Sequence, residues 1–306
     1  MNATIKVLIS MLLWGSIGVF VKNISLDSVE IAFFRGIIGS LFLLAVLFIK
    51  NRKNDLLVED ESNIDVTDKK QDIKNIFLLA ISGMVMGLNW VFLFNSYNYI
   101  TVANSTIIYY LAPVIVIFVS PIFLKEKLTA KKVGAVICAM FGLLLILKTQ
   151  ESSSANVDLT KGIINAFLAA CLYASVVILN KFIKNVDDYK RTFVQLLMAS
   201  VVVIPLVIMR NQIEFDSMKS IVFMLILGIA HTGIAYCLYF SAMKDLNAQS
   251  IAILGYIDPA SSIFFSIFLL KEAFSIWQLI GGAIILIAAF VAEKPPKAKK
   301  TNEANL

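Results

Sequence analysis

Residues 109–126 read YYLAPVIVIFVSPIFLKE, and residues 255–272 read GYIDPASSIFFSIFLLKE. A constant offset of 146 positions aligns their polar and turn-forming residues: Tyr110 with Tyr256, Pro113 with Pro259, and Lys125-Glu126 with Lys271-Glu272. Apolar matches arise easily in a hydrophobic chain, whereas tyrosine, proline and a Lys-Glu pair at unchanged spacing do not. The repetition therefore predicts that the chain consists of two copies of one unit.

The composition directs these segments to a membrane. Of the 306 residues, 59% are hydrophobic and 16% are charged, whereas soluble domains have about 45–50% and about 25%. A membrane-spanning helix needs ~20 mostly apolar residues, because lipid cannot pair the backbone polar groups. Ten such segments can be drawn: 5–21, 29–49, 73–94, 102–124, 133–147, 162–183, 192–209, 221–242, 250–270 and 276–291. The expected fold class is an all-α integral membrane protein with ten transmembrane helices.

The ten segments divide into two repeats of five, at residues 1–149 and 160–292. Because five is odd, the second repeat would enter the membrane from the opposite side, which makes the pair inverted. The polar segment 50–74 has mixed charge and few aromatic residues, so we expect a flexible cytoplasmic loop inserted into the first repeat. Residues 293–306 are expected to form a disordered basic tail.

The distribution of basic residues predicts the orientation. With a cytoplasmic N-terminus, 20 of the 27 lysines and arginines lie in cytoplasmic connections and 6 lie outside. The positive-inside rule then places both termini in the cytoplasm, in a multi-pass protein of the cell (plasma) membrane. No aromatic residues interleave with the basic clusters, so we expect contact with the lipid bilayer and not with nucleic acid.

Inverted repeats are typical of secondary transporters, whose substrate site lies near the membrane midplane between the repeats. The candidate substrate-binding residues are aromatic or polar side chains expected at that depth: Trp14, Asn89, Trp90, Tyr109, Tyr110, Tyr173, His231, Tyr236, Tyr256 and Asp258. Their rings would supply apolar area with polar tips. His231 and Asp258 are the titratable candidates, so they would carry any proton coupling.

Pro113 and Pro259 are the predicted hinges, because each removes a backbone donor near mid-membrane and should kink its helix. On an ideal helix Tyr256 and Asp258 point about 200° apart. They would face one cavity only if the break at Pro259 reorients them. Glu126 and Glu272 would act either as gates or as helix caps, and the capping role is favoured.

Arg35 is a charged residue inside the second expected span. A charge at that depth is costly unless it is paired or reaches the membrane surface. An anchoring or helix-packing role is favoured over substrate contact.

Three sets of residues resemble the EamA-type family of the drug/metabolite transporter superfamily. They are the two P-x(11)-KE patterns that begin at Pro113 and Pro259, MGLNWVFLFNSYNYITVA from Met86, and HTGIAYCLYFSAMKDLNAQ after Ala230. The resemblance implies ten transmembrane helices, a central cavity lined by both halves, and alternating-access transport, commonly export of amino acids or related metabolites. The first span lacks the coupling glutamate of the small multidrug branch. The spans also lack the several lysines and arginines of nucleotide-sugar or phosphate-sugar exchangers.

The expected function is secondary transport, in the direction of export, of small amphipathic metabolites such as amino acids. One alternative is uptake of a quaternary amine or other organic cation, held in a cation–π cage with Asp258 as counter-charge. Another is a structural or regulatory membrane protein without transport. One histidine and three scattered cysteines argue against an enzyme. No cofactor or metal is expected, and the fifth and tenth spans would be scaffold or homodimer contacts.

Overall fold

The computed structural model describes residues 1–21, 23–55, 69–96, 99, 105, 108–147, 159–210, 215–270 and 276–293, and within these ranges it contains helices and no strands. The helices of the first half are α1 (Ala3–Gly15), α2 (Ile17–Val21), α3 (Ser28–Asp55), α4 (Lys69–Ser96), α6 (Ala112–Leu124) and α7 (Ala130–Leu147). Those of the second half are α8 (Leu159–Phe182), α9 (Asp188–Arg210), α10 (Met218–Gly228), the π-helix η1 (Ile229–Ile234), α11 (Ala235–Ala242), α12 (Ala248–Leu254), α13 (Ile257–Leu270) and α14 (Ile276–Glu293).

Several helical segments of the described chain could span a membrane. Among the described residues, six are long and apolar enough to do so: Ala3–Val21, Val29–Ile49, Ile73–Leu93, Thr160–Phe182, Asp188–Arg210 and Met218–Ala242. Ala112–Leu124 is a shorter apolar helix. Large apolar side chains such as Leu41, Ile122 and Ile208 are exposed on the outside of the bundle. The protein is therefore an all-helical membrane protein, whose exposed apolar surface suits lipid.

The polar connection of the first half differs from its predicted bounds, 50–74. Helix α3 continues to Asp55 and α4 already begins at Lys69. Lysine, arginine and glutamine are good helix formers, so both helices extend beyond their apolar segments. Residues 56–68 lie outside the described part of the chain, as does the predicted tail beyond Glu293.

The two proline segments are interrupted just before the proline instead of being kinked at it. Helix α6 starts at Ala112, with Pro113 in its first turn. Likewise α12 ends at Leu254 and α13 starts at Ile257, with Pro259 in its first turn. The first N–H groups of a helix have no partner within it, so proline is tolerated there. Each segment is therefore broken a few residues before the position of the predicted kink, and the hinge role stays a prediction.

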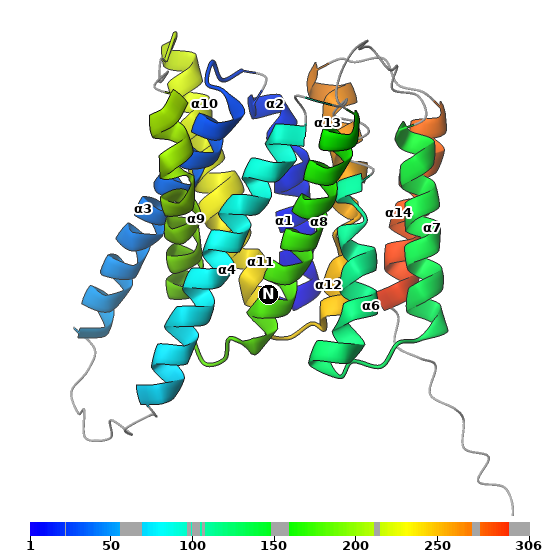
Figure 1. The fold of residues 1–306 in the computed structure, drawn as a ribbon, viewed down its shortest axis with the longest axis horizontal. Coiled ribbons are helices and arrows are strands. Elements are labelled where there is room, and N and C mark those ends of the chain that lie inside the picture. Colours follow the sequence, from blue (N-terminus) through cyan, green and yellow to red (C-terminus); the bar gives the residue numbers. More distant parts are fainter. Residues whose placement is uncertain are drawn as a thin grey trace, which may run out of the picture.

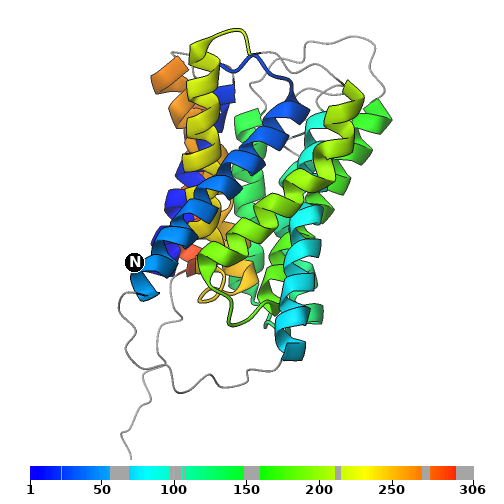
Figure 2. The ribbon, with the colours of Figure 1, turned by 90° about the vertical axis from the view of Figure 1, so that its left-hand side faces the viewer.

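The two halves pack together along the bundle. Helix α4 lies against α8 and α9, α3 against α9, and α1 against α11 and α13. Helices α7 and α14 form a pair at one side of the molecule, and α3 lies at the opposite side (Figure 1). Figure 2 shows α3, α9 and α4 next to one another from that side.

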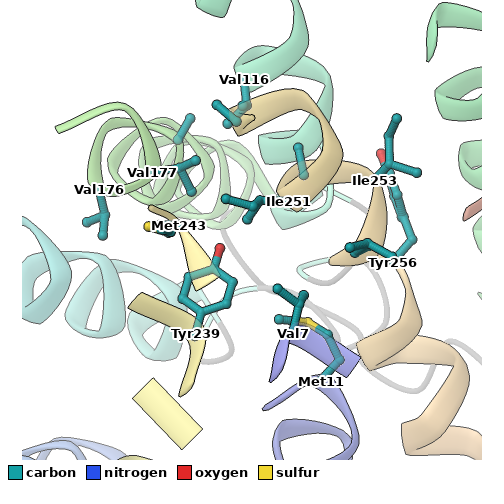
Figure 3. Packing of buried hydrophobic residues seen from close by; sticks show 14 of the residues in the cluster. Val7, Met11, Val116, Val176, Val177, Tyr239, Met243, Ile251, Ile253 and Tyr256 are labelled. Atoms are coloured by element: carbon teal, nitrogen blue, oxygen red, sulfur yellow. The ribbon is translucent and has the colours of Figure 1, made fainter. Parts of the chain in front are cut away.

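Glycines permit the close helix contacts. A Cβ atom on Gly83 would lie 2.5 Å from the carbonyl oxygen of Gln195, and one on Gly87 would lie 2.4 Å from that of Ala199. Side chains at these positions would push α4 away from α9. The centre of the bundle is a cluster of buried side chains from both halves, including Val7, Val116, Val177, Ile251 and Tyr256 (Figure 3).

Candidate functional site

Two tryptophans of the first half contact tyrosines of the second half. The ring of Trp14 lies 4.7 Å from Tyr236 and 4.9 Å from Tyr239, measured between centroids. Trp90 lies 6.0 Å from Tyr236. At these separations, tilted rings attract one another beyond the area that they bury. The contacts join α1 and α4 to α11.

Tyrosines at the two interrupted helices continue this group. Tyr173 and Tyr239 share a hydrogen bond between their hydroxyl groups, at 2.7 Å. Tyr173 also lies 5.8 Å from Tyr109. Tyr110 stacks on Tyr256 at 6.0 Å, and the Tyr256 hydroxyl donates to the Tyr110 carbonyl oxygen at 3.0 Å. The structure thus brings all the sequence-predicted aromatic residues into one group, which we call the aromatic cluster: Trp14, Trp90, Tyr109, Tyr110, Tyr173, Tyr236, Tyr239 and Tyr256.

The aromatic cluster is not uniformly buried. Trp90, Tyr236, Tyr239 and Tyr256 are buried. The remaining members, Trp14, Tyr109, Tyr110 and Tyr173, keep some accessible surface, and so does Asp258. These half-buried side chains lie between helices of both halves, so they are the surfaces that a bound small molecule could touch.

The interruption before Pro259 separates Tyr256 from the helix that contains Asp258. Asp258 lies in the first turn of α13, where the helix dipole favours a negative charge. Tyr256 comes just before this helix and stacks on Tyr110. Tyr256 and Asp258 therefore do not belong to one unbroken helix, in which their side chains would point in different directions.

His231 is held at the edge of the aromatic cluster by the π-helix η1. Its Nε2 lies 2.9 Å from the Ser16 hydroxyl and its Nδ1 lies 3.4 Å from the Ile226 carbonyl oxygen. Its own carbonyl oxygen accepts a hydrogen bond from Nε1 of Trp14 at 2.9 Å. Both ring nitrogens have partners and the residue is buried, so His231 connects the break between α1 and α2 to η1. Single π-helical turns frequently mark functional sites.

Arg35 reaches the aromatic cluster from α3. Its guanidinium carbon lies 4.6 Å from the centroid of the Trp90 ring, which is a cation–π contact. Its Nε donates to the Thr232 hydroxyl at 3.2 Å, and that hydroxyl donates to the Leu227 carbonyl oxygen at 2.9 Å. The sequence favoured an anchoring or helix-packing role for Arg35, and its contacts with Trp90 and Thr232 join α3 to α4 and η1.

Asn89 and Glu126 bind backbone groups. The Asn89 amide donates to the Ala169 carbonyl oxygen at 2.7 Å, which ties α4 to α8. Glu126 accepts from the backbone N–H groups of Ala248 at 2.7 Å and Gln249 at 3.3 Å. This is the geometry of a helix cap, and the capped helix, α12, belongs to the other half. Glu272 lies outside the described residues.

Tyr239, Ser16 and Thr232 are site residues that sequence reasoning missed. Tyr239 follows Tyr236 by three residues and therefore shares its helix face, a signal that could have found it. Ser16 and Thr232 had no such signal, because small polar residues are common in membrane helices. Among the described residues, no group of three or more His, Cys, Asp or Glu side chains could hold a metal ion.

The aromatic cluster lies between the two halves of the chain, and comparison with known proteins gives the class of protein. The model of the EamA-like transporter family matches residues 1–148 and again residues 160–293. The chain therefore belongs to the EamA-like transporter family and has its two-repeat architecture.

Individual relatives agree with this assignment. The chain is 30% identical over 304 residues to an uncharacterized transporter, YxxF, of Bacillus subtilis (strain 168), covering 99% of this chain and 93% of that protein. It is 23% identical over 273 residues to the pseudopaline exporter CntI of Pseudomonas aeruginosa, covering 89% and 88% of the two chains. A solved crystal structure shares the fold, with a TM-score of 0.80 at 17% identity, over 95% of this chain and 96% of that one.

Proposed function

We propose that the protein is a secondary active transporter that exports small amphipathic metabolites, such as amino acids, across the plasma membrane. It would work by alternating access around the aromatic cluster. In this proposal ten transmembrane helices form two inverted repeats of five, and both termini are cytoplasmic. Membership of a transporter family supports transport, and the similarity to an exporter supports the direction.

One observation carries the proposal: the aromatic cluster draws its residues from both repeats, and it meets the two interrupted helices. Tyr110 precedes the start of α6, and Tyr256 precedes the start of α13. A substrate between these helices would be exposed alternately when one repeat moves against the other. Interrupted helices in both repeats are the usual location of such sites.

Asp258 is the residue on which we propose that proton coupling depends. It is a half-buried acid that follows Tyr256 of the aromatic cluster by two residues. His231 is the weaker candidate, because both of its ring nitrogens already have partners. A proton carrier must exchange its proton with water, and accessible surface at Asp258 allows this.

A toxicity screen tests the transport proposal while the substrate is still unidentified. Cells that overproduce the protein are grown with inhibitory concentrations of individual amino acids, analogues and organic cations. We expect resistance to at least one amphipathic metabolite, and loss of resistance with Asp258→Asn at equal protein abundance. If cells that overproduce the protein resist no compound better than cells without it, export is contradicted. If the Asp258→Asn variant protects as well as the parent protein, export through this site is contradicted.

The uptake of organic cations is the second candidate. The rings and Asp258 would suit a quaternary amine. However, Arg35 brings a positive charge to the same cluster and would repel a purely cationic substrate. In the same screen, greater sensitivity to a toxic cation would favour uptake over export.

The inverted topology has its own test. Lys127 and Asp216 are exposed residues in the first and second repeats. Single cysteines at these positions, in a variant without Cys138, Cys171 and Cys237, are treated with a membrane-impermeant maleimide. We expect modification of position 216 in whole cells and of position 127 only after permeabilisation. The opposite pattern, or the same pattern at both positions, contradicts the proposed topology.

A further inference from the structure

We infer that Arg35 binds an anionic group of the substrate while Asp258 binds a cationic group, so that the aromatic cluster selects zwitterions such as free amino acids. This inference rests on the proposed transport function and assigns to its site a residue for which the sequence favoured an anchoring or helix-packing role.

The first argument is the way in which Arg35 is held. Among the described residues, its one hydrogen bond is made by Nε, to Thr232. Its guanidinium carbon lies over the Trp90 ring, 4.6 Å from the ring centroid. The two terminal nitrogens therefore keep their donors for another partner. A planar guanidinium held through Nε and a ring contact is suited to a two-pronged bond with a carboxylate.

The second argument is the position of the two charges relative to the tyrosines. Arg35 lies against the Trp90 ring, which in turn lies 6.0 Å from the ring of Tyr236. Asp258 follows Tyr256 by two residues, and Tyr256 stacks on Tyr110. Arg35 and Asp258 therefore both adjoin the aromatic cluster, one from α3 and the other from α13.

The third argument is that these two charges do not neutralise each other. No salt bridge joins Arg35 to Asp258 in the described part of the chain. Opposite charges within a membrane protein are costly when they stay apart, so such residues usually pair or bind ligands. A ligand with a carboxylate and an ammonium group would satisfy both, and its apolar portion would lie on the rings.

The close packing around Arg35 fixes its position. A Cβ atom on Gly39 of α3 would lie 3.1 Å from the Gly228 carbonyl oxygen and 3.2 Å from the Gly233 backbone nitrogen. Helix α3 can therefore approach η1 closely, and this places Thr232 within reach of Nε. A guanidinium held in this way loses little conformational freedom when it binds a carboxylate.

The test compares three charge types of the same compounds. The purified full-length protein in liposomes is given L-phenylalanine and L-leucine, the amides of both, and the corresponding acids without the amino group. Binding is followed by intrinsic tryptophan fluorescence, because Trp14 and Trp90 belong to the cluster, and exchange is followed with radiolabelled compounds. We expect the zwitterions to bind about 10-fold more tightly than either singly charged analogue.

Variants then separate the two charges. Arg35→Gln should weaken zwitterion binding about 10-fold and remove the preference over the amides, and Arg35→Lys should retain part of it. Asp258→Asn should remove the preference over the acids that lack the amino group. Arg191→Gln is the matched control, because Arg191 is also buried but donates to the carbonyl oxygens of Asn180 and Ile183. It should leave the selectivity unchanged.

The outcomes distinguish this inference from the proposed function. Exchange of the amides at the same affinity as the zwitterions overturns the role of Arg35 and leaves transport intact. Unchanged selectivity in folded Arg35→Gln and Arg35→Lys proteins also overturns the role of Arg35 and leaves transport intact. If none of the six compounds binds or is exchanged, amino-acid transport and the zwitterion site both fail.

Discussion

Two polar regions inside this helical bundle differ in how their groups are satisfied. Ser82, Asn180 and Gln195, which we call the amide network, lie at the junction of α4, α8 and α9. The Ser82 hydroxyl donates to Gln195 Oε1, Gln195 Nε2 donates to Asn180 Oδ1, and Asn180 Nδ2 donates to the Ser82 hydroxyl, each at 2.9 Å. All three side chains are buried, so the network is closed.

The aromatic cluster is open by comparison. Trp14, Tyr109, Tyr110 and Tyr173 keep accessible surface, as does Asp258 beside them. Intramembrane polar residues are often functional, but the amide network shows that they also join helices. What separates the two roles is whether the polar groups are already paired with one another and hidden from any ligand.

The two buried arginines repeat this contrast. Arg191 is 1% exposed and donates through both terminal nitrogens to carbonyl oxygens near the end of α8. Arg35 is 5% exposed and is held through the hydrogen bond of its Nε and through its contact with the Trp90 ring. Burial alone would class both as structural, whereas their hydrogen bonds distinguish a helix-end anchor from a group that can bind a ligand.

The largest predicted effect on transport is that of a substitution beside the aromatic cluster. Asp258→Asn removes the charge that would meet the substrate, and a hydrogen bond to a charged group is worth about 1.5–3 kcal/mol. We expect substrate exchange in liposomes to fall about 10-fold to 100-fold, with little change in the melting temperature. An unaffected exchange rate would remove Asp258 from the site.

The largest predicted effect on stability comes from the amide network. Gln195→Leu leaves the side chains of Asn180 and Ser82 without a buried partner, at a cost of about 1–3 kcal/mol. Thermal unfolding in detergent should show a clear loss, while exchange per folded molecule stays near that of the parent protein. Leu197→Met, on the same helix and outside the network, is the control. A Gln195→Leu protein that is stable but inactive in transport would contradict the structural role of the amide network.

The sequence predicted the repeats, the helical class and every residue of the aromatic cluster except Tyr239, because each depends on a local pattern. Tyrosine and proline at a fixed offset mark both interrupted helices, and apolar length marks the spans. The contacts between elements could not be predicted in this way. That His231 lies on a π-helix, where its carbonyl group accepts from Trp14, depends on how α1 packs against the second half. The partners of Arg35 could not be predicted for the same reason, since its contact with Trp90 joins separate helices.

A smaller effect, on substrate affinity, is expected when a hydrogen bond within the aromatic cluster is removed. Tyr173→Phe removes the bond to Tyr239 and leaves the ring in place. A neutral hydrogen bond contributes about 0.5–1.5 kcal/mol, so substrate affinity should change by about 2-fold to 10-fold. Titration by tryptophan fluorescence measures this. Tyr189→Phe is the control, because Tyr189 is exposed and lies outside the cluster. An equal change in that variant would show that the effect is not local.

The smallest effect is expected at the helix cap. Glu126→Gln keeps an acceptor for the N–H groups of Ala248 and Gln249 but removes the charge that favours the start of α12. The interaction of such a charge with a helix end is worth about 0.3–1 kcal/mol. A small fall in melting temperature is expected, with exchange retained. A complete loss of exchange in a stable protein would favour the gating role over the capping role.

Accessibility of the two regions to a water-soluble reagent tests the central claim most directly. Single cysteines replace Tyr110 in the aromatic cluster and Ser82 in the amide network, in a variant without the three native cysteines. An impermeant maleimide is then applied to either side of oriented vesicles, with and without a transported substrate. We predict that position 110 reacts from both sides and is protected by substrate, and that position 82 stays unreactive. Equal reactivity at both positions, or no reaction at position 110 from either side, would contradict the account.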